Sequence, residues 1–261
     1  MMIPFTKYHG TGNDFVMIDD RSATFDIENT VLIEEMCSRR FGIGADGLIL
    51  LRNAEGYDFE MIYFNADGNQ STMCGNGGRC IVQFAHSLGV FETECTFIAI
   101  DGAHEAKIVG DHQIKLKMVP VEQIHSDGEA LVLDTGSPHY VSIVESIDAI
   151  DVKLEGSRVR YSDQYAREGI NVNFIELGDG NIKVATYERG VEDETYSCGT
   201  GVTAAALAVQ KIASKRFQSP VHIKTKGGEL RVYFSKGEDK AYSDIWLEGP
   251  VTKTFEGKWV R

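Results

Sequence analysis

Two stretches of the sequence determine the fold. Residues 74–89 read CGNGGRCIVQFAHSLG, and residues 198–212 read CGTGVTAAALAVQKI. In each, a Cys-Gly-x-Gly start precedes a run that is apolar around most of a helical circumference, which is typical of a buried helix. Each also follows a predicted strand and a short polar loop. We therefore expect two buried helices, each beginning at a cysteine.

A second pair of motifs shows that the two stretches belong to a repeat. Thr11-Gly12-Asn13 corresponds to Thr135-Gly136-Ser137, and Cys74 corresponds to Cys198; both pairs are offset by 124 residues. Two motifs in one order at one offset indicate a duplicated unit. The turn chemistry of Ser126-Asp127-Gly128 favours a boundary close by. We predict lobes at residues 1–120 and 121–261, with the last strand free to pack across the boundary.

The predicted fold class is α/β (α+β), with two pseudo-symmetric lobes. Strand candidates rich in β-branched and aromatic residues run from Ile3–Tyr8 to Asp244–Leu247, and another helix is predicted near Glu28–Arg40. Each lobe would be a mixed sheet or barrel around its central helix. We expect the active site in the cleft between the lobes.

Composition limits the classes of function. The chain has 261 residues, 43% hydrophobic and 25% charged, with a net charge of −13. A negative chain without basic clusters repels phosphate, so we expect neither a nucleic-acid partner nor a membrane partner. No apolar run approaches the roughly 18 residues of a membrane span. The first residues lack a signal-peptide pattern, so a cytoplasmic location is predicted.

The five cysteines favour free thiols. Their number is odd in a large chain, and no second cysteine pair or histidine pair accompanies Cys74 and Cys80. We therefore expect no metal site. A cysteine at a helix N-terminus lies beside unpaired N–H groups and the positive end of the helix dipole, which favour its thiolate form. The same N–H groups can hold a carboxylate.

Two such thiols suit one kind of chemistry. Inversion of a stereocentre that carries a proton needs a base on one face and an acid on the other. A thiolate and a thiol from two similar lobes would meet that need without a cofactor. Cys74 and Cys198 are therefore candidate catalytic residues of a racemase or epimerase.

Further motifs give a family resemblance. Residues 9–15 (HGTGNDF), 42–47 (GIGADG), 65–68 (NADG), 73–80 (MCGNGGRC), 188–190 (ERG) and 198–201 (CGTG) resemble, in order, the motifs of diaminopimelate epimerase. The resemblance implies a pyridoxal-phosphate-independent enzyme that interconverts LL- and meso-2,6-diaminopimelate in lysine and peptidoglycan-precursor synthesis. It also implies a homodimer. Ser137, Gly47 and Tyr165-Ala166 depart from the family pattern.

The resemblance also assigns roles to individual residues. It implies that Cys74 and Cys198 are the catalytic pair and that His139 and Glu188 tune the thiols. The substrate-binding residues that it implies are Asn13, Asn65, Gly75, Asn76, Asn171, Glu188, Arg189, Gly199 and Thr200.

Three alternatives stay open at this point. A proline or hydroxyproline racemase would use the same two-thiol chemistry, but its first motif would carry His at the position of Asn76. A non-catalytic amino-acid-binding protein would not need two thiols at helix starts. A thiol redox protein would normally carry a C-x-x-C pair, which this sequence lacks.

Overall fold

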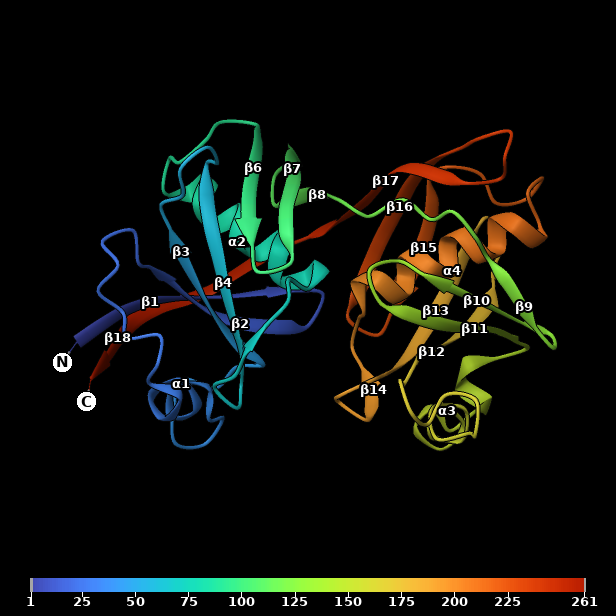
Figure 1. Cartoon of the computed structure of the whole chain (residues 1–261), viewed down its shortest axis with the longest axis horizontal. Coiled ribbons are helices and arrows are strands. Elements are labelled where there is room, and N and C mark those ends of the chain that lie inside the picture. The colour runs from blue at the N-terminus through green and yellow to red at the C-terminus, as the bar shows by residue number, and fades with distance from the viewer. Residues whose placement is uncertain (1, 261) are drawn as a thin grey trace. The chain divides into compact units, whose positions relative to one another are not determined.

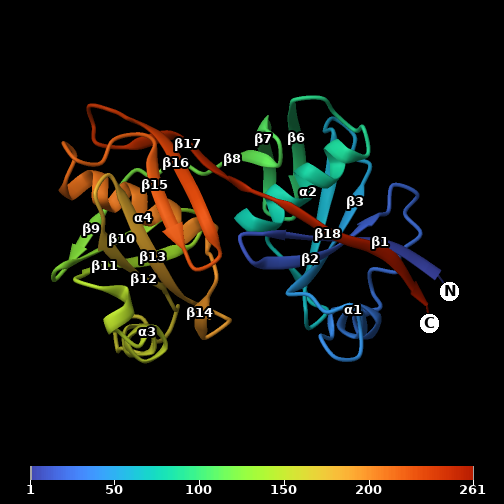
Figure 2. The same cartoon turned by 180° about the vertical axis from the view of Figure 1, so that it is seen from behind.

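The computed structural model describes residues 2–260, which form two compact units. Unit 1 contains the residues up to Leu116 together with those from Gly249 onward, and unit 2 is Lys117–Glu248. Each unit contains a run of paired strands, both parallel and antiparallel, and its own pair of helices (Figures 1 and 2).

Unit 1 is built on a sheet in which the strands follow the order β18, β1, β2, β3, β4, β6, β7, β8. The pairs β2–β3 and β4–β6 are parallel and the others antiparallel, while the short β5 pairs with β4. Strand β18 lies along β1 in both views, with Val260 opposite Met2 (Figure 2). The bounds are β1 Met2–Gly10, β2 Asn13–Asp19, β3 Gly47–Arg52, β4 Phe59–Asn65, β5 Gln70–Ser71, β6 Glu94–Ala99, β7 Gly102–Gly110, β8 Gln113–Lys117 and β18 Thr252–Val260.

The two helices of unit 1 cover opposite faces of this sheet. Helix α1 (Thr30–Cys37) packs in one cluster with Val16, Leu48 and other residues of β2 and β3 that point to its side. Helix α2 (Gly75–Ser87) contacts β1, β2, β3, β4 and β7, and it is buried from Gly75 through Ala85. The strands beside it are therefore buried on both faces, which explains their continuous apolar character. The sheet wraps around α2.

Unit 2 repeats this topology. Its strands follow the order β9, β10, β11, β12, β13, β15, β16, β17, with β11–β12 and β13–β15 parallel and the short β14 on β13. The bounds are β9 His125–Asp127, β10 Ala130–Asp134, β11 Pro138–Val144, β12 Asn171–Leu177, β13 Asn181–Glu188, β14 Asp193–Thr195, β15 Val221–Thr225, β16 Gly228–Lys236 and β17 Tyr242–Pro250.

The helices of unit 2 also match those of unit 1. Helix α4 (Gly199–Ile212) is buried from Gly201 through Val209 and contacts β10 to β13, β15 and β16. Helix α3 (Val152–Arg160), preceded by a 3₁₀ turn at Ile147–Ala149, packs on β12 and β13. The predicted class, α/β with mixed sheets around a central helix, is confirmed.

Two local expectations differ from the structure. The helix predicted near Glu28–Arg40 extends only over Thr30–Cys37, because the Asn29 side chain caps its start and Ser38 turns to an extended conformation. Helix α3 is not expected from the sequence, because it is short and buries only Val152 and Gly156. Among residues 2–260, no helix has the length and apolar character required to cross a membrane.

Candidate active site

In unit 1 the candidate site is organised by the start of α2. Cys74 is the N-cap residue, and its Sγ accepts a hydrogen bond from the backbone N–H of Gly77 at 3.2 Å. The first α-helical bond runs from Gly78 to the Cys74 carbonyl at 2.7 Å. Gly75 and Asn76 precede that bond, at the positions whose N–H groups bind anions at helix starts. A Cβ on Gly77 would lie 3.2 Å from Cys74 Sγ, so this position favours glycine.

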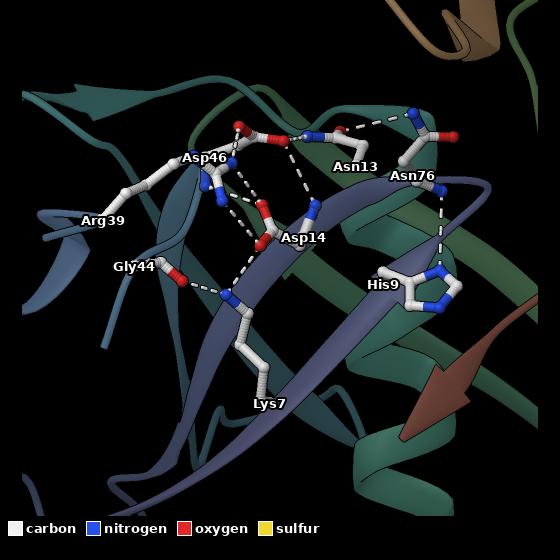
Figure 3. Close-up of polar contacts among 9 residues, drawn as sticks. Lys7, His9, Asn13, Asp14, Arg39, Gly44, Asp46 and Asn76 are labelled. Carbon is white, nitrogen blue, oxygen red and sulfur yellow. Dashed lines mark hydrogen bonds and ion pairs between the residues drawn. The ribbon is translucent and has the colours of Figure 1, made fainter. Parts of the chain in front are cut away.

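Asn13 brings the β1–β2 turn to this helix start. Its Oδ1 accepts from Asn76 Nδ2 at 3.3 Å and faces Cys74 Sγ at 3.9 Å. Its Nδ2 donates to Asp46 Oδ2 at 2.7 Å (Figure 3). Because the carboxylate can only accept, it fixes the orientation of the amide. The Asn13 carbonyl oxygen is thereby directed at Cys74.

Asp46 is itself held by a charged network (Figure 3). Arg39 Nη2 bonds Asp46 Oδ1 at 2.6 Å and Asp14 Oδ1 at 2.8 Å, and Lys7 Nζ bonds Asp14 Oδ2 at 2.7 Å and also the Gly44 carbonyl. Burial alone raises the pKa of Asp14, but the hydrogen bonds and charges of Arg39 and Lys7 lower it to about 2. Both carboxylates therefore act as fixed acceptors behind Asn13.

Asn65 lies at the end of β4, opposite Gly47 of β3. Its backbone closes the following turn, with N–H donating to Asn69 and C=O accepting from Gly68. Gly47 has no room for a side chain: a Cβ there would lie 2.5 Å from the Phe64 carbonyl oxygen. The close pairing of β3 with β4 therefore requires glycine at position 47, where this sequence departs from the family pattern.

In unit 2 the same position of α4 carries Cys198. Its side chain is buried, and Sγ lies 3.5 Å from Thr200 Oγ1. The first α-helical bond runs from Val202 to the Cys198 carbonyl, so Gly199 and Thr200 lie in the anion-binding position. Thr135, the repeat counterpart of Thr11, donates to the Thr200 carbonyl at 2.9 Å. The turn before β11 is thereby tied to the start of α4.

His139 is fully buried on β11, close to Asn173 of β12. Asn173 Nδ2 lies 3.0 Å from His139 Nδ1, and Asn173 Oδ1 accepts from Thr186 Oγ1 at 2.9 Å. Burial, assisted by the charge of Arg189, lowers the pKa of His139 to about 3. The imidazole is therefore neutral. A Cβ on Gly201 would lie 2.4 Å from Asn173 Oδ1 and 3.2 Å from Cys198 Cβ, so this network reaches the first turn of α4.

Asn171 uses its amide inside the protein. Nδ2 donates to Ser137 Oγ at 2.8 Å and to the Pro138 carbonyl, and Oδ1 accepts from the backbone N–H of Arg189 at 2.9 Å. It therefore links the loop before β11 to the turn after β13. Asn171 thus holds Ser137-Pro138 and the Arg189 backbone in fixed positions relative to each other.

Glu188 ends β13, and Arg189 follows it in an exposed turn. Arg189 Nη1 donates to the Glu168 carbonyl at 3.0 Å. The turn is braced by Glu192, which accepts from the hydroxyls of Tyr161 and Tyr187 at 2.9 and 2.8 Å. A rigid support thus lies behind the two predicted binding residues.

Some of the predicted residues contact one another within their own units. Unit 1 brings Asn13, Cys74 and Asn76 together, and unit 2 brings Cys198 and Thr200 together and places Asn171 against the backbone of Arg189. Among residues 2–260, no three His, Cys, Asp or Glu side chains form a group that could hold a metal ion.

Comparison with known proteins identifies the family. The family profile described as diaminopimelate epimerase matches residues 5–124 and 131–253. A diaminopimelate epimerase of Flavobacterium psychrophilum is 50% identical over 251 residues, 96% of this chain and 97% of the relative. One of Chlorobaculum tepidum is 42% identical over 257 residues, 95% of this chain and 98% of the relative. The chain belongs to the diaminopimelate epimerase family.

Solved structures of distant relatives share the fold. A Bacillus anthracis phenazine biosynthesis protein superposes with a TM-score of 0.79 over 100% of both chains at 14% identity. A hydroxyproline epimerase of Agrobacterium vitis superposes with a TM-score of 0.68 over 98% of this chain and 92% of its own, also at 14% identity. At these identities the likeness concerns the fold alone.

Three polar residues of this family member were not among the predicted site residues. Asp46 orients Asn13, Asn173 holds His139, and Arg79 is fully buried beneath the start of α2. Asp46 lies in the GIGADG motif, so the motif was a usable signal. Asn173 lies two residues after Asn171 in a predicted strand, so the sequence indicates that both side chains point to the same face. Nothing local indicates the burial of Arg79, because an arginine in a helix is usually exposed.

Proposed function

We propose that this protein is a pyridoxal-phosphate-independent isomerase that interconverts LL- and meso-2,6-diaminopimelate, in lysine and peptidoglycan-precursor synthesis. The observation that carries the proposal is the pair of cysteine N-caps. Cys74 and Cys198 begin equivalent helices in two units with the same strand order, in a chain of the diaminopimelate epimerase family. Each thiol would serve one face of the substrate's α-carbon.

The chemistry is balanced without a cofactor or metal. One cysteine thiolate removes the α-proton and becomes a thiol, leaving a carbanion at the α-carbon. The other cysteine, initially a thiol, delivers its proton to the opposite face and becomes a thiolate. The configuration inverts, the protonation states of the two cysteines exchange, and the reverse reaction restores them.

The remaining predicted residues have roles in this proposal. The helix starts at Gly75-Asn76 and Gly199-Thr200 hold the α-carboxylate, which stabilises the charge that develops on deprotonation. The predicted side chains Asn13, Asn65, Asn171, Glu188 and Arg189 bind the substrate. His139 and Glu188 tune the thiols. Support for Asn13 comes from its fixed amide, and support for Asn171 from its bond to the backbone of Arg189.

We further propose that residues 1–120 and 121–261 act as two lobes that bind the substrate in the cleft between them. The equal strand orders of the two units support a pair of repeated lobes, with β18 of the second segment packing on β1 of the first. A homodimer in the cytoplasm, with diaminopimelate as the only small-molecule partner, completes the proposal.

Proton NMR in deuterium oxide tests the proposed reaction. The reduced protein is incubated with LL-diaminopimelate, and with proline and glutamate in parallel. We expect formation of the meso isomer with deuterium at the α-carbon and no exchange on the controls. Exchange on proline alone would replace the substrate with that of a proline racemase. No exchange on any of the three, with both thiols shown to be reduced, would refute the enzyme function.

Cysteine variants test the pairing of the two thiols. We expect Cys74→Ser and Cys198→Ser each to lower kcat by about 10²- to 10⁴-fold, the usual contribution of a general acid or base. Cys95→Ser is the matched control, because Cys95 is a buried thiol in β6. A large loss in only one of the two site variants would contradict symmetric two-base chemistry.

A further inference from the structure

Arg79 is a fully buried arginine that has no carboxylate partner among residues 2–260. Its side chain is 0% exposed, in the second turn of α2, five residues after Cys74. Nη1 donates to the Gly75 carbonyl at 3.1 Å, and Nη2 donates to Asn76 Oδ1 at 2.9 Å and to Thr11 Oγ1 at 3.3 Å. All three acceptors are neutral, and within residues 2–260 Nε has no hydrogen-bond partner. A buried cation normally has an anionic partner, so its absence requires an explanation.

The acceptors of Arg79 are parts of the candidate site. Gly75 and Asn76 form the helix start that follows Cys74, and Asn76 also contacts Asn13. The guanidinium therefore contacts the two residues that directly follow Cys74, from the buried side of the helix start. A Cβ on Gly10 would lie 3.3 Å from Arg79 Nη2, so β1 must approach closely to enclose the group.

Two thiols lie close enough for their charge to act on this guanidinium. Burial lowers the pKa of Arg79 to about 10, and negative charge on Cys80 or Cys74 would raise it. Cys80 is completely buried, and burial raises its own pKa far above neutral, so it stays a thiol. Cys74 is only partly buried and lies at the positive end of the helix dipole. Cys74 is thus the group that can supply the missing negative charge.

The position of unit 2 that corresponds to Arg79 carries no charge. The counterpart of Arg79, at the repeat offset, is Thr203. Thr203 Oγ1 donates to the Gly199 carbonyl at 2.9 Å, the same i−4 bond that Arg79 makes to Gly75, but Thr203 is neutral. The buried histidine of unit 2, His139, is also neutral. The two cysteine helix starts therefore match in backbone and differ in the side chain buried behind them. The cation that acts on the buried histidine of unit 2 is Arg189, which lies in an exposed turn.

We propose that Arg79 is the fixed positive charge that holds Cys74 as a thiolate, so that in the free protein Cys74 rests ionised and Cys198 rests as a thiol. Arg79 acts through Cys74 and does not touch the substrate. Its catalytic meaning rests on the proposed function, since a two-base isomerase needs one thiolate and one thiol before each turnover. The geometry assigns the resting thiolate to unit 1.

Several charged groups on β1, β2 and β7, which surround α2, have partners of their own. On β1 and β2, Lys7 and Asp14 form an ion network with Arg39, and His9 accepts from the Gly12 N–H. At the start of β7, His104 pairs with Asp101, which also accepts from the Met73 N–H at 3.3 Å. The Asn13 carbonyl oxygen, 3.9 Å from Cys74 Sγ, favours the thiol form of Cys74. The N–H of Gly77, the helix start and the charge of Arg79 favour the thiolate. On β4, Tyr63 packs edge-on against Phe15.

Site-resolved alkylation tests the proposal without reference to catalysis. The reduced wild-type protein is treated with iodoacetamide from pH 5.5 to 9.5, and labelling of Cys74 and Cys198 is quantified separately by peptide mass spectrometry. We expect the midpoint for Cys74 to lie below that for Cys198. In Arg79→Met, which removes the charge and keeps the length, the Cys74 midpoint should rise by about 1 to 2 pH units, with that of Cys198 unchanged. Arg79→Lys is the matched control and should keep the Cys74 midpoint low.

Several results would overturn the proposal. One is a wild-type Cys74 midpoint equal to or above that of Cys198, a comparison that remains decisive if Arg79→Met does not fold. Another is an equal shift in Arg79→Met and Arg79→Lys, which would assign the effect to hydrogen bonding and not to charge. An active epimerase with no difference between the thiols would refute this inference alone. A low Cys74 midpoint in a protein inactive on diaminopimelate would refute the proposed function alone.

Discussion

Asn173 Nδ2 lies 3.0 Å from Nδ1 of His139, and both side chains are fully buried in unit 2. The same Nδ2 also donates to the Tyr140 carbonyl at 3.2 Å. Because a carbonyl can only accept, the NH₂ end of the Asn173 amide, and not its oxygen, faces His139. His139 Nδ1 is therefore the acceptor, and the neutral ring carries its proton on Nε2. Within residues 2–260, this buried Nε2 has no hydrogen-bond partner.

Asn173→Asp should reverse this tautomer. A carboxylate at position 173 can only accept, so His139 Nδ1 must carry the proton, and the buried negative charge raises the pKa of His139 from about 3. We expect kcat to fall about 10- to 100-fold, as when a partner that orients a functional histidine is lost. Nitrogen-15 shifts of the histidine ring between pH 5 and 9 report the tautomer. Asn53→Asp, on the surface of unit 1, is the control. Titration of wild-type His139 within that range would contradict the argument.

The helix starts are local features, so the sequence alone predicts them well. Glycines after a cysteine followed by an apolar run are sufficient to place α2 and α4, which begin at Gly75 and Gly199. Strand β18 is harder to predict, because it is mostly exposed and its partner β1 comes from the opposite end of the chain. Pairing over such a separation leaves no periodic signal in either segment.

The side chains that support the site depend on burial, which the sequence does not reveal. Asn171 and Asn173 lie two residues apart, so their side chains point to the same face of β12. Asn171 nevertheless contacts Ser137 and the Arg189 backbone, whereas Asn173 contacts His139. Their separate roles follow from which strands lie on each side of β12. Arg79 is charged and lies in an otherwise apolar helix, and only the tertiary packing shows that it faces inward. The positions of the two cysteines at helix starts are thus predictable from the sequence, and the buried side chains behind them are not.

Asp46→Ala should impair the site through Asn13. The variant removes the acceptor of Asn13 Nδ2, so the amide can rotate and its Oδ1 no longer faces Cys74. We expect kcat/KM for diaminopimelate to fall about 10- to 100-fold, a typical effect of losing an orienting partner. Asp46→Asn keeps an acceptor oxygen and should restore most of the activity. Asp19→Ala, which breaks the comparable surface pair with Arg21, should leave kcat/KM unchanged. Equal losses in Asp46→Ala and Asp46→Asn would mean that the charge is needed, not the orientation.

The ion pairs of Asp14 with Lys7 and Arg39 should raise the free energy of unfolding at neutral pH, and this contribution should be lost in strong acid. The pKa of Asp14 falls from 3.8 in the unfolded chain to about 2 in the folded protein, so the unfolded state binds more protons between these values. The contribution is complete above about pH 4 and disappears as the pH falls through 2. Asp14→Asn should therefore lower the free energy of unfolding at pH 7, with the difference from wild type shrinking in acid. Urea unfolding at pH 7, 4 and 2.5 measures this. A difference that does not change with pH would show that the ion pairs with Lys7 and Arg39 are not its source.

Gly47→Ala should destabilise unit 1 by steric overlap. The new Cβ would lie 2.5 Å from the Phe64 carbonyl oxygen and 2.6 Å from Tyr63 Cε2, and the backbone of β4 cannot move without disturbing its pairing with β3. Overpacking of this kind costs about 1–3 kcal/mol. Gly110→Ala is the matched control, since its Cβ would meet no atom closer than 3.8 Å. It should change the free energy of unfolding by less than about 0.5 kcal/mol. Equal unfolding midpoints in urea for the two variants would mean that β3 and β4 can separate at Gly47, and that a larger side chain could reach the site from this position.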